Sequence, residues 1–322
     1  MKPLRAEEIR GNWATLLSAW NEDGSPDYGR MDAEITALIE ARVDGIYSNG
    51  TAGEFHCQTE AEFDRISELF ATRCEQAGMS FQIGVSHMSA QISLERLRRV
   101  TALAPGAVQV ILPDWFPVTK PEALDFLQRM AETAAGIGLV LYNPPHAKKV
   151  WNPEDIGCLA AQVPSLVGLK TAGGDDAWYE RMRTHLSGIS VFVPGHLLAS
   201  GIQRGARGAY SNVACLSPAA AQRWYDGMET DIEAALEIES RLRRFMDLHI
   251  VPFIRDQGYC NAACDRLLAL IGGWADVGEY MRWPYRSIPA AEAIRLRPVA
   301  AGLLPEFFEE QRGIHDAGGV VL

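Results

Sequence analysis

The sequence predicts a (β/α)8 barrel followed by a helical extension, and three observations support this fold class. Eight short apolar runs recur at fairly even spacing over residues 1–217, with helical segments between them. Most of these runs are continuously apolar, as expected of parallel strands that are buried on both faces. After residue 217 the pattern is helical throughout, and no linker rich in glycine or serine intervenes. We therefore expect a barrel over residues 1–217 and helices packed on it over residues 218–322.

The predicted strands are bounded by glycine, proline or polar residues, which end regular structure. In chain order they are Trp13–Trp20, Gly45–Asn49, Phe81–Val85, Val108–Leu112, Leu139–Tyr142, Leu166–Lys170, Ser190–Val193 and Ala209–Ser211. Because the active sites of such barrels lie at the carboxyl ends of the strands, the residues that end these runs are the first candidates for a functional site.

The helical segments carry recognisable start signals. Thr59 with Glu62 three residues later forms a capping box, and Pro121 and Pro153 each stand at a helix start with acidic residues in the first turn. The predicted helices include Thr59–Gln76 and Ser89–Ala102 between strands, and Pro218–Met246 (as one helix or two), Ala262–Ile271 and Ala290–Leu304 in the extension.

The composition excludes several classes of function. Of the 322 residues, 48% are hydrophobic and 22% are charged, which is ordinary for a globular protein. The net charge of −11 argues against binding to nucleic acid or to an anionic membrane surface. No apolar run is long enough for a membrane-spanning helix, and the first residues do not resemble a signal peptide. Six cysteines without Cys-x-x-Cys spacing indicate reduced thiols, so we expect a cytoplasmic protein.

The functional prediction depends on Lys170, at the end of the buried run that begins at Leu166. A lysine at the mouth of a buried strand is costly to keep charged, because desolvation favours the neutral amine. A neutral amine is a nucleophile that forms a Schiff base with a ketone or an aldehyde. The alternative is a lysine that extends into solvent just past a strand end.

Two further strand ends carry matching chemistry. The loop that begins at Gly50 places Thr51 and Ala52 between two glycines, so that backbone N–H groups and one hydroxyl can bind a carboxylate. It lacks the lysine of a phosphate-binding loop, and it could be only a tight turn. Glu54 is expected to be structural, hydrogen-bonding amides of the loop, and not to be a catalytic base. Tyr142 ends the fifth run and can relay a proton if its neighbours support the phenolate, or it can be a core aromatic with a satisfied hydroxyl.

The three motifs together resemble a known family. Gly-Thr-x-Gly-Glu from Gly50, Tyr-Asn-x-Pro from Tyr142 and Gly-x-Lys ending at Lys170 occur in the order found in the dihydrodipicolinate synthase and N-acetylneuraminate lyase family, each at the end of the proper strand. The resemblance covers about residues 11–217 and extends more weakly to Arg282-Trp283-Pro284. It implies a homo-oligomeric barrel enzyme, commonly a tetramer or a dimer, that needs no metal and no cofactor.

The resemblance also implies a mechanism. Lys170 would attack the keto group of a pyruvate-type substrate, and Tyr142 would move protons as the carbon–carbon bond is made or broken. Thr51 would hydrogen-bond the tyrosine hydroxyl, and the loop of Gly50, Thr51 and Ala52 would hold the substrate carboxylate. The partners implied are small molecules, a 2-keto acid and an aldehyde.

This chain departs from the family pattern at three positions. Ala52 replaces the second hydroxyl of the glycine-flanked motif. Trp115 stands where dihydrodipicolinate synthases carry a relay tyrosine, and an indole cannot accept or pass that proton. Ala147 stands where those enzymes carry an arginine for the carboxylate of the second substrate. The activity of dihydrodipicolinate synthase itself is therefore not expected.

Other residues at the strand ends are candidates for binding the rest of the substrate. Trp115 would favour a flat or apolar partner by stacking, and His146 and Tyr210 are assigned to the same substrate site. His56 and His196 follow other strands, and each of the three histidines can equally be a loop-capping or solvated residue. Their spacing is not that of a metal site, so no metal is expected.

Three functions fit this sequence. The first is an aldolase or lyase that cleaves or forms a pyruvate-containing 2-keto acid. The second uses the same lysine to dehydrate a 2-keto-3-deoxy sugar acid, or to hydrate and cleave an aromatic ylidenepyruvate. The third is a non-catalytic protein that binds a keto acid. Lys170, Tyr142 and Thr51 serve either enzyme, and their presence together argues against the third function.

Overall fold

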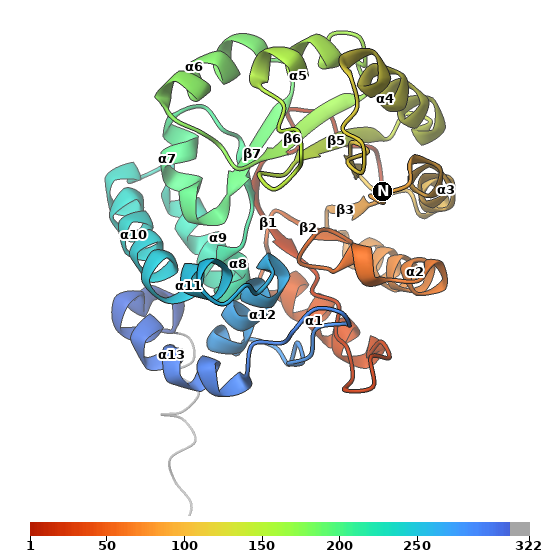
Figure 1. Ribbon diagram of the computed structural model, residues 1–322. Helices are drawn as coiled ribbons and strands as arrows, with labels where there is room; N and C mark the ends of the chain where they lie inside the picture. Colours follow the sequence, from red (N-terminus) through yellow and green to blue (C-terminus); the bar gives the residue numbers. More distant parts are fainter. Residues whose placement is uncertain (310–322) are drawn as a thin grey trace, which may run out of the picture.

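The computed structural model describes residues 1–309 and confirms the predicted fold class. Eight parallel strands form a closed barrel (Figure 1). The strands follow sequence order around it, and β8 pairs with β1 to complete the ring. The strands are β1 (Gly11–Thr15), β2 (Gly45–Ser48), β3 (Phe81–Gly84), β4 (Ala107–Ile111), β5 (Gly138–Asn143), β6 (Leu166–Thr171), β7 (Ser190–Pro194) and β8 (Gly208–Tyr210).

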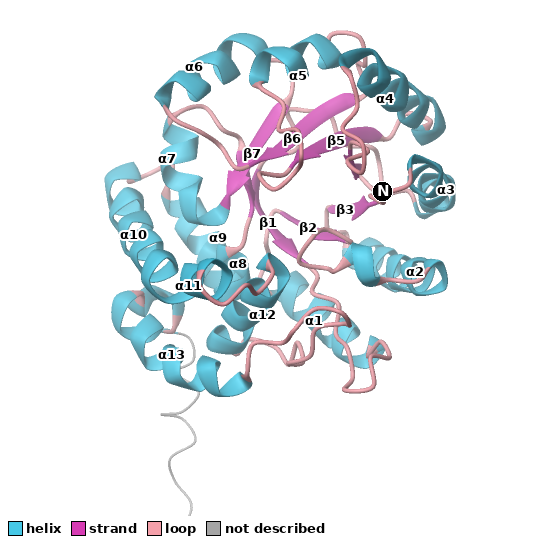
Figure 2. Ribbon diagram, viewed as in Figure 1, coloured by secondary structure: helices cyan, strands magenta, loops and turns pink. Residues whose placement is uncertain are grey.

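Helices surround the barrel on its outside, as Figure 2 shows. They are α1 (Tyr28–Glu40), α2 (Glu60–Ala77), α3 (Ala90–Val100), α4 (Lys120–Ala134), α5 (Pro153–Ala160), α6 (Asp176–His185), α7 (Leu198–Gln203) and the short α8 (Val213–Leu216) after β8. The main apolar core contains side chains from both the strands and these helices. A second apolar cluster, to which Trp13, Tyr47 and Phe192 belong, contains residues of several strands. The barrel is therefore filled by side chains, as in other barrels of eight strands.

The first predicted strand is wrong at its carboxyl end, because β1 ends at Thr15 and not at Trp20. The N–H of Leu16 still donates to the carbonyl of Tyr47 over 2.9 Å, but the chain then leaves the barrel. Trp20 forms isolated antiparallel bridges with residues 26 and 280 instead. Residues 16–20 are all buried. Their largely apolar character therefore comes from a buried loop, which periodicity alone cannot distinguish from a buried strand.

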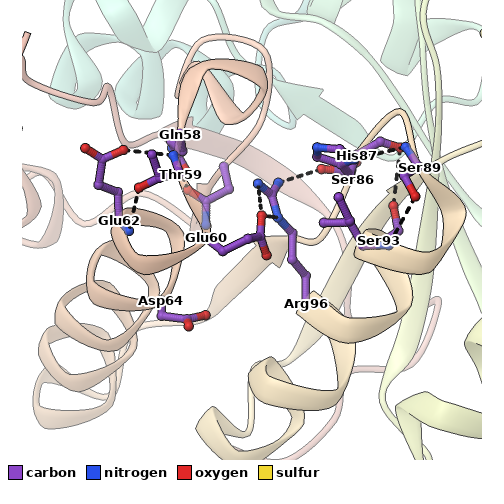
Figure 3. Close-up of polar contacts among 12 residues, drawn as sticks. Gln58, Thr59, Glu60, Glu62, Asp64, Ser86, His87, Ser89, Ser93 and Arg96 are labelled. Carbon is purple, nitrogen blue, oxygen red and sulfur yellow. Dashed lines mark hydrogen bonds and ion pairs between the residues drawn. The ribbon is translucent and has the colours of Figure 1, made fainter.

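The predicted capping box at the start of α2 is confirmed. The Thr59 side chain accepts from the N–H of Glu62, and the Glu62 carboxylate accepts from the N–H of Thr59 over 2.8 Å (Figure 3). Beside it, the buried guanidinium of Arg96 on α3 donates to Glu60 over 2.9 Å and to the carbonyl of Ser86 over 2.8 Å. These contacts join the start of α2 to α3 and to the loop after β3.

The chain after the barrel is helical, as expected. The segment predicted over Pro218–Met246 is two helices, because Asp231 starts a new one by accepting a hydrogen bond from the N–H of Ala234. These elements are α9 (Pro218–Gly227), α10 (Ile232–Phe245), the π-helical turn η4 (Met246–Ile250), α11 (Val251–Arg255), α12 (Asn261–Gly272) and α13 (Ala290–Leu303).

The helices of this region lie against the barrel. α12 packs against α8, α10 packs against α7, and α9 contacts β1. Residues 310–322 of the predicted extension lie outside the described residues. Within residues 1–309, no helix has both the length and the apolar character that crossing a membrane requires.

Candidate active site

Lys170 lies on β6, and three tyrosine rings enclose its amine. The Nζ atom lies 4.5 Å from the ring centroid of Tyr142, 4.7 Å from that of Tyr47 and 5.2 Å from that of Tyr210. Tyr142 is the register neighbour of Lys170 on β5, whereas Tyr47 belongs to β2 and Tyr210 to β8. Closure of the barrel therefore brings together rings from distant parts of the sequence. An ammonium is attracted to aromatic faces, but the rings replace only part of the hydration that it loses.

Loss of solvent shifts the ionisation of Lys170. Burial lowers its pKa from 10.5 to about 8, against the opposing charge of the Asp265 carboxylate on α12. Burial likewise raises the pKa of Asp265 to about 7, and the Lys170 ammonium opposes this shift. With a pKa near 8, roughly a tenth of the Lys170 side chains carry a neutral amine at pH 7. The neutral amine is the nucleophilic form, so the site keeps a nucleophile available near neutral pH.

Tyr142 and Thr51 are joined by a hydrogen bond between their side chains. Burial raises the pKa of Tyr142, and the bond to Thr51 acts in the opposite direction. Thr51 belongs to the loop between β2 and the 3-10 turn η1 (Phe55–Cys57). This loop needs glycine at position 50, because a Cβ added there would lie 2.9 Å from the Tyr47 ring. The close approach of the loop to Tyr47 thus helps to place Thr51 beside Tyr142.

A cavity of about 690 Å³ borders this group at the carboxyl ends of the strands. Thr51 and Tyr142 both belong to its wall, so it adjoins the enclosure of the Lys170 amine. Loops after β2, β3, β4 and β5 form most of the wall. The helical extension contributes further residues, which are Ile254, Tyr259, Cys260, Asn261 and Tyr285. A cavity of this size accommodates a small organic substrate.

Several residues predicted for substrate binding lie outside this cavity wall. Trp115 is 70% exposed, and its ring centroid lies 4.8 Å from the amine of Lys148. Tyr210 is buried, and its hydroxyl donates to Gln82 over 2.6 Å. Gly50 and Ala52 are buried within their loop. The cavity wall includes Thr51 and His146 but none of these four predicted residues.

The three histidines have different surroundings. His56 and His146 both line the cavity, and burial, with a smaller contribution from the charge of His146, lowers the pKa of His56. The His56 ring also makes an edge contact with Tyr285 over 5.0 Å between centroids. His196 lies outside the cavity wall, and its ring shares a hydrogen bond of 3.0 Å with Asn212. Within residues 1–309, the His, Cys, Asp and Glu side chains form no group of three that could hold a metal ion.

Glu54 has the structural role that was expected of it. It is fully buried and accepts from the indole N–H of Trp20 over 2.9 Å and from the backbone N–H of Arg282 over 3.0 Å. Its other strong partner is the buried guanidinium of Arg266 on α12, at 3.0 Å. Glu54 thus ties the loop that carries Thr51 to the helical extension.

The contribution of the helical extension to the site was not predicted from the sequence. Asn261 and Asp265 lie four residues apart on one face of α12, and Asn261 lines the cavity. A signal was present, because Asp265 and Arg266 are the only charged residues of a largely apolar helix. Gln109 on β4 was missed as well. It is buried, and among the described residues neither atom of its side-chain amide has a hydrogen-bond partner.

With this geometry established, comparison with known proteins decides the family. Residues 8–292 match the model of the Dihydrodipicolinate synthetase family. The chain belongs to this family. It is 24% identical over 257 residues to an N-acetylneuraminate lyase of Escherichia coli O1:K1 / APEC, which covers 76% of this chain and 83% of the relative. The resemblance predicted from the three strand-end motifs is confirmed.

Solved structures show the same fold. A putative dihydrodipicolinate synthetase from Pseudomonas aeruginosa superposes with a TM-score of 0.80 at 20% identity, covering 93% of this chain and 99% of that chain. YagE, a prophage protein of the dihydrodipicolinic acid synthase family from E. coli K12 solved in complex with pyruvate, superposes with a TM-score of 0.81 at 18% identity, covering 92% and 98%. At these identities the likeness establishes the fold of the chain.

Proposed function

We propose that the protein is a lyase that breaks or makes a carbon–carbon bond of a pyruvate-containing 2-keto acid through a Schiff base on Lys170. The observation that carries this proposal is the enclosure of the Lys170 amine by three tyrosine rings next to a cavity of about 690 Å³. Desolvation there favours the neutral amine that a Schiff base requires. Membership of the Dihydrodipicolinate synthetase family supports the same chemistry.

The proposed reaction begins when the neutral amine attacks the 2-keto carbon and water leaves, which creates an iminium. The iminium draws in the electron pair of the bond between C3 and C4, so that this bond breaks and leaves an enamine and an aldehyde. Tyr142, in its hydrogen bond with Thr51, is positioned to carry the proton that moves between the C4 hydroxyl and C3. General acid–base help of this kind contributes about 10²–10⁴ in rate.

The remainder of the substrate is proposed to occupy the cavity. Its wall includes His56, His146 and Lys149, which can hydrogen-bond hydroxyl or carboxylate groups. Ala147 also lines it, at the position where dihydrodipicolinate synthases carry an arginine. We therefore propose an aldehyde partner different from that of dihydrodipicolinate synthase.

Reduction with borohydride in the presence of pyruvate tests the lysine chemistry. The expected result is a covalent adduct, located on Lys170 by peptide mass spectrometry and absent from Lys170→Ala. Lys148→Ala, which removes an exposed lysine outside the cavity wall, is the matched control and should retain the adduct. A wild-type protein that gives no adduct with pyruvate or with any other 2-keto acid would refute the proposal and favour a binding protein.

The products then separate two reactions of the same lysine. Incubation with a panel of 2-keto-3-deoxy sugar acids should release pyruvate and an aldehyde. Release of the same two products from aromatic ylidenepyruvates, which must first take up water, would instead identify a hydratase-aldolase. A dehydrated keto acid without pyruvate would instead identify the protein as a dehydratase. In either case Tyr142→Phe should lower turnover by about 10²–10⁴ while the adduct on Lys170 still forms.

A further inference from the structure

Asp265 is an acidic residue whose charge acts on the Lys170 amine, and the reaction proposed above does not use it. It lies on α12, one turn after Asn261, and Asn261 lines the cavity. Residues four apart on a helix share a face, so Asp265 is on the side of α12 that is turned toward the site. The Asp265 charge acts to raise the pKa of Lys170 on β6, of Tyr142 on β5 and of Tyr47 on β2. Asp265 thus lies on the side of α12 that is turned toward the site, and its charge acts on the lysine.

The Asp265 carboxylate has no evident structural task. Within residues 1–309 it takes part in no hydrogen bond, and it forms no ion pair with an N–O distance of 4.0 Å or less. Its sequence neighbour Arg266 forms an ion pair with Glu54 and donates a hydrogen bond to the carbonyl of Ser18 instead. A partly buried carboxylate without a partner is costly to maintain, which calls for a reason to keep it. Because Asp265 and Lys170 form no direct hydrogen bond or ion pair, a proton that passes between them needs a bridging water molecule or substrate atom.

We propose that Asp265 is a second acid–base residue of the site, which takes a proton from the Lys170 ammonium and delivers it to the oxygen that leaves as water. The inference rests on the proposed Schiff-base function. It explains why the extension places a carboxyl group opposite the lysine, on a helix whose remaining residues, apart from Arg266, are uncharged. Tyr142 alone would otherwise have to serve every proton transfer around the amine.

The proposed step balances in atoms and charge. The Asp265 carboxylate first accepts a proton from the Lys170 ammonium, which leaves a neutral amine and a carboxylic acid. The amine attacks the keto carbon, and Tyr142 gives its proton to the carbonyl oxygen and takes one from the nitrogen, which yields a neutral carbinolamine. The carboxylic acid of Asp265 then protonates the carbinolamine hydroxyl, and water leaves. The products are the iminium, one water molecule and the original Asp265 carboxylate.

The ionisation of the two groups is consistent with this exchange. The pKa of Asp265, about 7, and that of Lys170, about 8, differ by roughly one unit, so a proton passes between them at little cost. The other titratable groups that feel the Asp265 charge are Tyr47, Tyr142, Cys215 and Cys264. Burial raises the pKa of each of these four, so all are neutral near pH 7. Asp265 and Lys170 are therefore the pair in this group that exchanges a proton at that pH.

The test measures how fast the imine with pyruvate forms, by rapid mixing and borohydride quenching, over a range of pH from 5 to 9. Asp265→Asn should form it at least about 10²-fold more slowly than the wild type and should lose the ionisation near pH 7. Asp265→Glu should recover part of the rate. In Asp265→Ala, added formate should restore the rate in proportion to its concentration, because it supplies the missing carboxyl group. Asp256→Asn, which removes an exposed acid before α12, is the matched control.

The outcomes separate this inference from the proposed function. If the wild type forms no imine, the Schiff-base function itself fails. If the wild type forms it and Asp265→Asn does so at the same rate with the same pH profile, only the role of Asp265 is refuted. A slow variant whose pH profile is unchanged, together with no rescue of Asp265→Ala by formate, also refutes it, because that result indicates a structural role. Circular dichroism of each variant establishes that the compared proteins are folded.

Discussion

Replacing Lys170 by methionine should stabilise the protein while it abolishes imine formation. Methionine keeps an unbranched, mostly apolar side chain of similar length in the space between Tyr47, Tyr142 and Tyr210. It removes an amine whose charged form is disfavoured by burial. A lysine whose pKa is lowered by folding reduces stability wherever the unfolded chain binds the proton and the folded chain resists it. This reduction is fully present below the folded pKa near 8 and disappears as the pH rises toward 10.5.

The magnitude follows from the shift in the pKa of Lys170. The difference between 10.5 and about 8 is about 2.5 units. At about 1.4 kcal/mol per unit, this corresponds to about 3.5 kcal/mol of free energy of unfolding at pH 7. At pH 9.5 the same arithmetic leaves about 1 kcal/mol. The increase in the free energy of unfolding caused by Lys170→Met should therefore fall steadily between pH 7 and pH 10.

Urea unfolding of the wild type and of Lys170→Met, followed by circular dichroism at several pH values, measures this difference. Lys170→Met also leaves Asp265 without the ammonium that favours its carboxylate, so the same comparison is made in the Asp265→Asn background. Lys2→Met, which replaces an exposed lysine, is the control and should change stability little at any pH. Two results would refute the expected destabilisation by the Lys170 ammonium. In the first, Lys170→Met is no more stable than its parent protein at pH 7. In the second, it is stabilised equally at pH 7 and pH 10.

Two further predictions concern the loop that carries Thr51. Arg266→Met leaves the fully buried carboxylate of Glu54 without its ion-pair partner. It should therefore lower the free energy of unfolding, measured by urea denaturation, by about 3–5 kcal/mol. A decrease below about 1 kcal/mol would contradict the importance of this ion pair. Thr51→Val keeps the shape of the side chain but removes its hydrogen bond to Tyr142. Turnover should fall by about tenfold, while the borohydride adduct on Lys170 should still form. Unchanged turnover would argue against a role for that hydrogen bond.

Much of the fold was readable from local patterns. The eight apolar runs and the capping box at Thr59 are local features, and each has a direct physical cause in strand burial or in the unpaired N–H groups of a helix start. The end of β1 was not readable, because Leu16–Trp20 is as apolar as a strand. It is buried by contacts with residues distant in the sequence, such as the bridge between Trp20 and Tyr280. Pattern alone reports that a segment is buried and leaves open what buries it.

The candidate site also combines features that are local in the sequence with contacts between distant residues. By itself the sequence predicted Lys170 as the nucleophile and Tyr142 and Thr51 as its helpers, because each lies at or just after the end of a strand and the carboxyl ends of all barrel strands meet on one face. The tertiary structure alone decided that Tyr47 and Tyr210 enclose the amine, that Trp115 lies exposed outside the cavity wall, and that Asp265 approaches from a helix beyond the barrel. The physical reason is that desolvation and charge act through space. Barrel closure and the packing of α12 bring together groups that no spacing along the chain connects.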